Sequence, residues 1–426
     1  MTNALQTRPT GRLARSLLLT VLFITPAVVL RVSGIHPDPV IALLVFGAAV
    51  VAASFVLAWA AESAQIDVSG GLAIAVLALI AVLPEYAVDL YYAYVAGHNA
   101  EYVQYAAANM TGSNRLLMGI GWPVVVIVGL YVAQKTSAAR DGVSKSVLPL
   151  EPGNRIELGF LFIAGLVAFI IPATGRIHLV LGVAMLAWFG FYLYKLTRGE
   201  PEEPDLVGTA AAIGELPDRA RRITVVTMFV VAGVVILMCA KPFADSLVTA
   251  GSQLGVDRFL LVQWLAPLAS EAPEFIIAII FATRGNSTAA IGTLIASKVN
   301  QWTLLVGSLP IAYRIGGGSG PLLLDARQIE EVLLTATQTM MGVALILALR
   351  FHRNTAWALL ALFVIQFPVT STTGRLVLCA VYATFAVVGL IINRQHILAT
   401  LRAPFVDADD DVELPDSDRE LSAVRK

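Results

Sequence analysis

The sequence has 426 residues, of which 57% are hydrophobic and only 14% are charged, and its mean hydropathy is +0.77. This composition excludes an ordinary soluble domain and predicts a polytopic membrane protein. A formal net charge of −1 also argues against nucleic acid as a partner, because binding a polyanion needs a concentrated basic field. The two cysteines, Cys239 and Cys379, fall in apolar segments, so we expect neither a disulfide framework nor a thiolate metal site. The partners to expect are the lipid bilayer and small monovalent or divalent cations.

Apolar segments of the length that crosses a bilayer as a helix recur along the whole chain. In chain order they lie near 15–31, 39–62, 71–97, 102–132, 157–173, 177–196, 223–247, 258–283, 287–313, 330–350, 354–369 and 375–393. The sequence therefore predicts an all-α polytopic membrane protein with about twelve transmembrane helices.

Charge and proline divide the chain into parts. The segment TRGEPEEPDLVGTAAAIGELPDRARR, residues 197–222, is too polar to span a membrane and is interpreted as a cytoplasmic linker between two halves. Residues 397–426 are acidic and are interpreted as a solvated cytoplasmic tail, with a regulatory cation sensor as the alternative. The remaining parts are an extra N-terminal transmembrane helix within 1–38, a first half at 39–196, a second half at 223–369 and an extra C-terminal transmembrane helix at 370–396.

The distribution of lysine and arginine predicts the orientation, because these residues concentrate in cytoplasmic loops. With twelve spans and the N-terminus inside, the inner side collects about twenty of these residues and the outer side about six. We therefore expect an integral protein of the bacterial inner (plasma) membrane with both termini in the cytoplasm.

Residues 81–121 and 269–307 share one layout. Each has Pro-Glu followed by an aromatic residue in mid-span, then a turn with glycine and asparagine, then a span that opens with small and polar residues around a serine. If each half contains five spans, the odd number makes the second copy enter the membrane from the opposite face. We therefore expect ten helices to form two inverted-topology repeats, with an ion site near the midplane where polar residues interrupt the helices.

Glu85 and Glu274 each follow a proline in the middle of a predicted span, where a carboxylate is costly unless it meets a cation, a proton or a partner. Helical spacing places Asp89 on the face of Glu85 and Ser270 on the face of Glu274. Oxygens of this kind are hard donors, which suit Na⁺ or Ca²⁺. Any single hydroxyl or amide could instead make a helix–helix hydrogen bond. The other candidate ligands are Asn109, Thr111, Ser113, Asn114, Thr293, Ser297, Asn300 and Gln301.

Four short motifs resemble the two alpha-repeats of the Ca²⁺:cation antiporter superfamily, which includes the Na⁺/Ca²⁺ exchangers. They are LPE at 83–85, NMTGSN at 109–114, EAPE at 271–274 and GTLIASK at 292–298. The resemblance implies that Glu85 and Glu274 are the principal cation-coordinating carboxylates, with Ser113 and Ser297 as hydroxyl ligands. It also implies a secondary antiporter without a cofactor that moves Na⁺ or H⁺ against Ca²⁺ or another cation. Transport would occur by alternating access, with two helices sliding against a core of eight.

Lys298 stands where the family pattern has an asparagine. If it faces Glu85 and Glu274, it is a tethered counter-ion that takes the place of one transported cation, which favours sodium/proton exchange over Ca²⁺ binding. Alternatively, it forms a structural ion pair with Glu271 or Asp89. Arg115, directly after the first serine-containing motif, is expected to point toward the surface, to an aqueous vestibule or Glu101.

Two other classes of function compete with transport. An intramembrane enzyme is not expected, because Asp89 has no Gly-x-Gly-Asp partner and the chain has no His-Glu-x-x-His helix. A non-transporting membrane cation sensor is the remaining alternative, supported by the incomplete ligand set and the acidic tail.

Overall fold

The computed structural model describes residues 9–67, 82–136, 146–198 and 206–406. In the first part of the chain the helices are α1 (Pro9–Ser33), α2 (Pro39–Ala64), α4 (Leu83–Ala96), η1 (Ala100–Tyr102), α5 (Val103–Leu116), η2 (Leu117–Gly121), α6 (Trp122–Thr136), α7 (Asn154–Ala168), α8 (Ile170–Thr174) and α9 (Leu179–Leu196). They continue with α10 (Gly208–Gly214), α11 (Asp218–Leu254), α12 (Arg258–Thr283), α13 (Ser287–Asn300), η4 (Gln301–Leu305), α14 (Val306–Ile315), α15 (Ala326–Ile346), α16 (Arg353–Ile365), α17 (Thr372–Ile392), α18 (Arg394–Arg402) and η5 (Ala403–Phe405).

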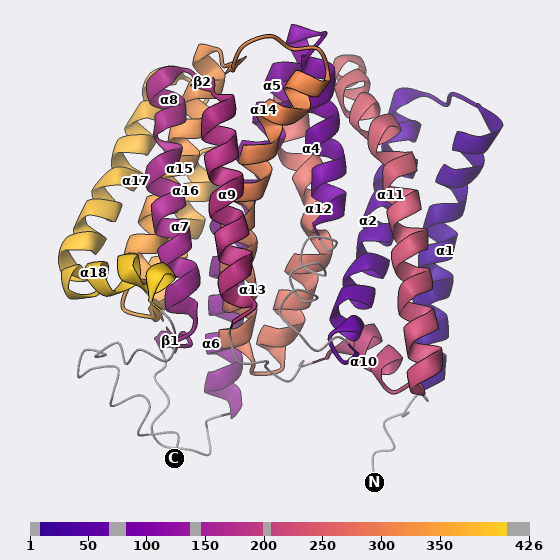
Figure 1. Ribbon diagram of the computed structural model, residues 1–426, viewed down its shortest axis with the longest axis horizontal. Helices are drawn as coiled ribbons and strands as arrows, with labels where there is room; N and C mark the ends of the chain where they lie inside the picture. Colours follow the sequence, from indigo (N-terminus) through magenta and orange to yellow (C-terminus); the bar gives the residue numbers. More distant parts are fainter. Residues whose placement is uncertain (1–8, 68–81, 137–145, 199–205, 407–426) are drawn as a thin grey trace.

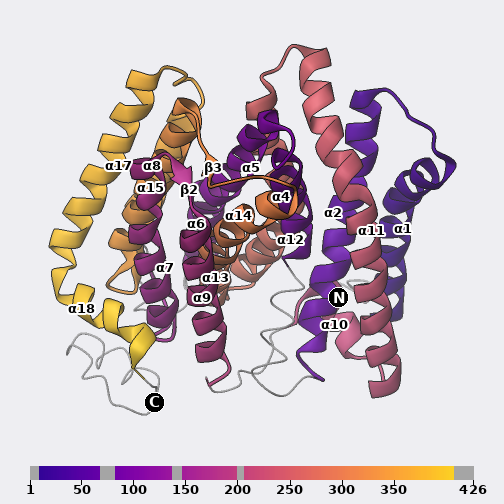
Figure 2. The ribbon, with the colours of Figure 1, turned by 45° about the horizontal axis from the view of Figure 1, so that its top comes forward.

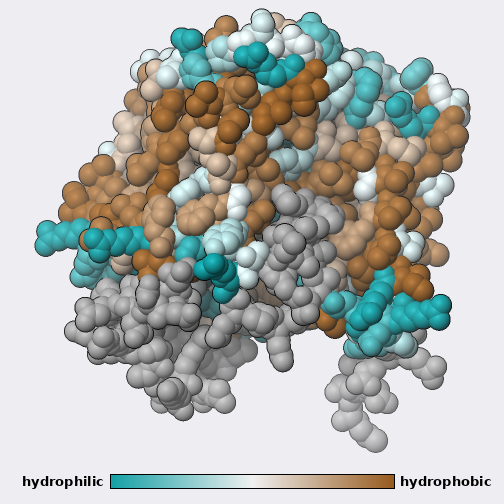
Figure 3. Space-filling view, in the orientation of Figure 1, coloured by the Kyte–Doolittle hydropathy of each residue, from teal (hydrophilic) through white to brown (hydrophobic). Residues whose placement is uncertain are grey.

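Within the described residues, nine helical segments are long and apolar enough to cross a membrane. On the face shown in Figure 3, apolar side chains form a band across the middle of the molecule, with hydrophilic side chains above and below it. The expectation of an all-α polytopic membrane protein is therefore confirmed. The predicted span at 258–283 coincides with α12, whereas 71–81 of the predicted span 71–97 lies outside the described residues and α4 covers the rest.

The helices gather in three groups along the long axis of the molecule (Figures 1 and 2). Helices α1, α2 and α11 pack together at one end, and α7, α15 and α17 lie at the other. Between them stand α4, α5, α12, α13 and α14, so the polar motifs of the sequence occupy the centre.

Two short antiparallel ribbons connect the halves of the chain. Strand β1 (Val147–Pro149) pairs with β4 (Arg350–His352), and β2 (Arg176–Ile177) pairs with β3 (Leu322–Leu323). Strands β1 and β3 precede the matching helices α7 and α15, while β2 and β4 precede α9 and α16. The two ribbons are therefore equivalent: each pairs a strand of one half with the non-matching strand of the other half. Strand β1 lies at the bottom of the molecule and β2 at the top in Figure 1.

The two halves also share a local irregularity. Helix α5 continues into η2 and α13 continues into η4, and each of these five-residue segments has the wider turn of a π-helix. Such turns occur frequently at functional sites because they redirect side chains and backbone carbonyls. Both follow directly on the serine-containing motifs, and Lys298 follows Asn114 by 184 residues, the same offset that separates the starts of η2 and η4.

The segment at 197–222, expected to be a linker, contains more structure than the sequence indicated. Its residues 208–214 form α10, which docks on α1, α2 and α11, and the Ser63 hydroxyl donates to the Ala210 carbonyl at 3.2 Å. Nearby, Asp67 pairs with Arg221 and Arg222 at 2.7 and 2.9 Å. These guanidiniums hold the pKa of the Asp67 carboxyl well below its usual range. This pairing ties the end of α2 to the start of α11.

The close approach of α5 to α12 depends on a glycine. A Cβ atom on Gly112 would lie only 1.7 Å from the carbonyl oxygen of Gln263, so α12 would have to shift. We expect Gly112→Ala to lower the free energy of unfolding by about 2 kcal/mol, the range of overpacking substitutions. Gly190→Ala, on α9 with no atom within 4 Å, is the matched control and should leave it unchanged or raise it. Thermal unfolding of the detergent-solubilised protein measures both; equal Tm values for the two variants would contradict the close approach.

Candidate functional site

Glu85 lies in the first turn of α4, where Pro84 fits because it has no amide hydrogen to leave unpaired. The carboxylate therefore sits at the positive end of a helix that begins inside the protein, and its side chain is only 6% exposed. The Ser113 hydroxyl of α5 donates to the Asn109 carbonyl at 3.1 Å and lies within reach of the Glu85 carboxylate.

Glu274 has a different backbone setting. It lies inside the continuous helix α12, which contains both Pro267 and Pro273. Its Oε2 accepts a hydrogen bond from the Ser297 hydroxyl of α13 at 3.0 Å. Glu85 and Glu274 interact electrostatically, so the structure brings the two predicted carboxylates and their predicted serines together at the centre of the molecule.

A third carboxylate belongs to this cluster. Glu271, one turn before Glu274 on α12, is 2% exposed and accepts a hydrogen bond from Gln301 Nε2 at 2.7 Å. It interacts electrostatically with Glu85 and Glu274 and lies within hydrogen-bonding reach of Ser113. Glu271 was not among the predicted ligands, although it belongs to the EAPE motif and its spacing from Glu274 places both on one helix face.

The remaining candidates divide into two sets. Asn109 Nδ2 donates to Asp89 Oδ1 at 2.8 Å, and Asn300 Oδ1 accepts from the Tyr86 hydroxyl at 2.8 Å, so these side chains join neighbouring elements. Tyr86 was missed because an aromatic residue after Pro-Glu also fits simple packing. In contrast, the hydroxyls of Ser270, Thr293 and Thr111 donate to carbonyls of their own helices.

Lys298 is 1% exposed and donates two hydrogen bonds, to the backbone oxygen and to the Oδ1 atom of Asn114, at 2.5 and 2.8 Å. Asn114 is the residue that matches Lys298 in the first half. Among the described residues the ammonium forms no ion pair, so the expected pairing with Glu271 or Asp89 is not observed. Glu271 and Glu85 are nevertheless its strongest favourable electrostatic partners.

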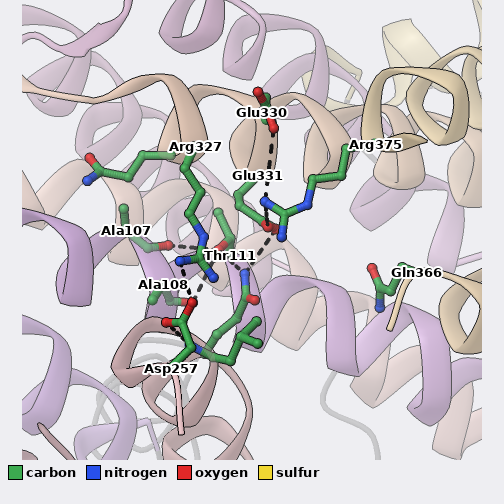
Figure 4. Close-up of polar contacts among 12 residues, drawn as sticks. Ala107, Ala108, Thr111, Asp257, Arg327, Glu330, Glu331, Gln366 and Arg375 are labelled. Carbon is green, nitrogen blue, oxygen red and sulfur yellow. Dashed lines mark hydrogen bonds and ion pairs between the residues drawn. The ribbon is translucent and has the colours of Figure 1, made fainter. Parts of the chain in front are cut away.

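The expectation that Arg115 points toward the surface is wrong. Its side chain is 2% exposed and pairs with Glu331 of α15 at 2.5 Å, while Gln366 accepts a second hydrogen bond at 3.1 Å. Glu331 also pairs with Arg375 of α17 at 2.8 Å, as Figure 4 shows, and accepts from Gln263 of α12. The cluster was missed because its members come from helices that are distant in sequence.

A pocket of about 280 Å³ reaches the site from the end of the molecule where α2 and α9 finish. Its polar lining combines predicted site residues with two further residues, Glu62 of α2 and Gln65, which directly follows that helix. The polar lining residues are Glu62, Gln65, Glu274, Thr293, Ser297 and Asn300.

The chemistry of the site follows from its carboxylates. Glu85 and Glu271 are buried and Glu274 is half-buried, and three interacting carboxylates in this setting cannot all be ionised without a cation or protons to balance them. One oxygen each of Glu85, Asp89 and Glu271 is enclosed and has no hydrogen-bond partner among the described residues. Within the residues that the structure describes, no group of three or more aspartate, glutamate, histidine or cysteine side chains is arranged to hold a metal ion by itself. A cation would therefore be held by carboxylates together with hydroxyl and amide oxygens.

This architecture, with carboxylates buried at the centre of a helical membrane protein, is that of an ion transporter. The family described as sodium/calcium exchanger protein matches residues 39–198 and 224–390. The chain belongs to this family and is a membrane cation antiporter, not an enzyme, which confirms the resemblance inferred from the sequence.

Three solved structures share the fold. The H⁺/Ca²⁺ exchanger CAX is 39% identical over 93% of this chain and 98% of its own, with a TM-score of 0.85. The Ca²⁺/H⁺ antiporter protein YfkE is 17% identical over 86% and 99%, with a TM-score of 0.56. The sodium-calcium exchanger NCX_Mj is 15% identical over 78% and 99%, with a TM-score of 0.51. No curated protein matches the chain.

The buried cluster around Arg115 can be tested by neutralising its central acid. We expect Glu331→Gln to lower the free energy of unfolding by about 3 kcal/mol or more, because two buried guanidiniums lose their counter-charge. Glu330→Gln is the matched control, since Glu330 lies 4.0 Å from Arg375 and is more exposed than Glu331; its effect should stay below about 1 kcal/mol. Denaturant unfolding in detergent measures both, and equal losses would show that Glu331 is not the centre of the cluster.

Proposed function

We propose that the chain exchanges Ca²⁺ for H⁺ across a bacterial inner membrane, with Glu85 and Glu274 as the principal carboxylates. The observation that supports this most directly is that the buried Glu85 and the half-buried Glu274 interact electrostatically while each has a serine hydroxyl within reach. Similarity to the H⁺/Ca²⁺ exchanger CAX favours exchange of Ca²⁺ for H⁺ over exchange of Ca²⁺ for Na⁺.

Protons and Ca²⁺ compete for the same oxygens in this mechanism. Two protons or one divalent cation neutralise Glu85 and Glu274 equally well, so binding one displaces the other. Glu271 and Asp89, each with an enclosed unpartnered oxygen, carry further protons or complete the ligand set. The serine hydroxyls, together with the amide oxygens of Asn109, Asn114, Asn300 and Gln301, supply neutral ligands. The hydroxyls of Ser113, Ser270 and Thr293 donate their protons to carbonyls of their own helices, which leaves their oxygen lone pairs to bind a cation.

Lys298 acts in this proposal as a tethered counter-ion. Its charge favours the ionised forms of Glu271 and Glu85, and it takes the place of one transported cation. The alternative function, sodium/proton exchange, follows if this charge excludes a divalent ion altogether. A non-transporting cation sensor is the second alternative and predicts binding without flux.

We further propose that α2 to α9 and α11 to α16 are inverted-topology repeats that hold ten spans of about twelve, with both termini cytoplasmic. The exchangeable ribbons and the matched wide turns η2 and η4 support this arrangement. The proposed units keep the boundaries 39–196 and 223–369, flanked by extra helices within 1–38 and 370–396, with a linker at 197–222 and an acidic tail at 397–426. Helix α1 lies outside both family matches, whereas the second match includes most of α17.

The carboxylate assignment is tested by ion flux in proteoliposomes. Glu85→Gln and Glu274→Gln should each reduce proton-driven Ca²⁺ uptake by about 30-fold or more, because each removes a charge from a buried cation site. Glu330→Gln, outside the site, should transport normally. Na⁺, K⁺, Ca²⁺ and pH gradients are varied one at a time; uptake that survives both glutamate substitutions would reject the assignment, and uptake driven by Na⁺ alone would favour the alternative.

The role of Lys298 is tested by restoring the family residue. We expect Lys298→Asn to lower the Ca²⁺ concentration at half-maximal uptake by about threefold or more, because the repulsion of a divalent ion is removed. Lys298→Arg keeps the charge and should retain wild-type ion preference. Unchanged proton coupling and ion preference in Lys298→Asn would eliminate the counter-ion role while leaving the carboxylate assignment intact.

A further inference from the structure

Helices α2 and α11 carry the same short motif in mirrored positions. They pack against each other and run antiparallel, with α1 and α10 beside them (Figure 1). In the C-terminal part of each helix stands Ala-acid-Ser, as Ala-Glu-Ser at 61–63 and as Ala-Asp-Ser at 244–246. Since the helices are antiparallel, Glu62 and Asp245 lie toward opposite faces of the membrane.

Glu62 faces the pocket that leads to the central site. It lines that pocket together with Gln65, which directly follows the same helix, and with Glu274. Its Oε2 atom is enclosed and has no hydrogen-bond partner among the described residues. A carboxylate and an amide at a pocket mouth are hard oxygen donors that suit a partly hydrated divalent cation.

Asp245 is in the opposite situation, because both of its oxygens are occupied. Oδ1 accepts from the Tyr91 hydroxyl of α4, and Oδ2 pairs with Lys241, both at 2.7 Å. The Lys241 ammonium also donates to the Tyr91 hydroxyl at 3.0 Å. One residue along each helix, the Tyr92 hydroxyl donates to the Ala244 carbonyl at 3.0 Å, so α11 is fastened to α4 at this level.

We propose that Glu62 and Asp245 are a matched pair of mouth carboxylates, each receiving the divalent cation when its own face of the exchanger is open. Here Glu62 lines the pocket with an unpartnered oxygen, while the Lys241 ammonium and the Tyr91 hydroxyl occupy the two oxygens of Asp245. The inference rests on the proposed Ca²⁺ transport and adds a receiving site at each end of the path.

The geometry explains how the closed face can open. Lys241 and Asp245 are 57% and 35% exposed, and such partly exposed pairs are weak because water competes for them. Movement of α11 away from α4 separates Asp245 from Tyr91 and frees an oxygen for an arriving cation. Because Asp67 ties α2 to α11, the same movement displaces Glu62 from its pocket.

The test is Ca²⁺ uptake by the full chain in oriented proteoliposomes, with half-saturation measured from each face. Glu62→Gln should raise the half-saturating Ca²⁺ concentration about fivefold at the cytoplasmic face only, with the maximal rate changed less than about twofold. Glu62→Asp should restore it. Asp245→Asn should do the same at the opposite face, and Lys241→Met should lower the half-saturating concentration there.

Surface controls separate local binding from general charge effects. Glu215→Gln and Glu101→Gln neutralise exposed acids at the two ends and should leave half-saturation unchanged. Equal effects at both faces, a loss of maximal rate alone, or an unchanged Lys241→Met would overturn the proposal. If Glu274→Gln loses flux while Glu62→Gln keeps the wild-type half-saturating Ca²⁺ concentration, only this inference is rejected. Undiminished flux in Glu274→Gln would reject the proposed function itself.

Discussion

The cost of burying a charge in a low-dielectric interior governs this protein. A carboxylate at membrane depth needs a cation, a proton or several hydrogen bonds, and the chain meets this need in two ways. Glu331 is surrounded by two guanidiniums and an amide, so its charge is matched by fixed partners. Glu85 and Glu271 each retain an unpartnered enclosed oxygen, so their charge can be matched by something that moves. The structural acid Glu331 therefore differs from Glu85 and Glu271 in how many of its carboxylate oxygens have fixed protein partners.

The two networks touch through consecutive residues of α5. Asn114 accepts both hydrogen bonds of Lys298, and Arg115 turns to the other side of the helix to meet Glu331. Fixing Arg115 therefore fixes Asn114, and with it the position of the buried ammonium. The two hydrogen bonds to Asn114 position the ammonium, and Glu271 and Glu85 attract it. The Arg115–Glu331 ion pair thus helps to position the buried Lys298 ammonium without contacting it.

The sequence predicts the spans and the paired glutamates because both are local properties. A run of apolar residues reveals a helix whatever surrounds it, and Pro-Glu in mid-span is unusual in any context. The partners of Lys298 and Arg115 were not predicted, because they depend on the rotation and depth of neighbouring helices. The same holds for Glu62, whose place near a predicted span end looked like ordinary solvation. Which residues of two neighbouring helices lie opposite each other is a property of the tertiary structure and cannot be read from a single sequence.

The strength of contacts also differs between the two parts that must move against each other. Buried ion pairs join α5, α15 and α17, which makes them costly to separate. Helix α11 is fastened to α4 by partly exposed polar groups, yet to α2 by the double pairing of Asp67. Small side chains along α2, such as Ala49, Ala53 and Ala60, let the backbones of the pair approach closely. The least costly motion therefore moves α2 and α11 as one unit across a core that stays intact, which changes access to Glu85 and Glu274 without dismantling the site.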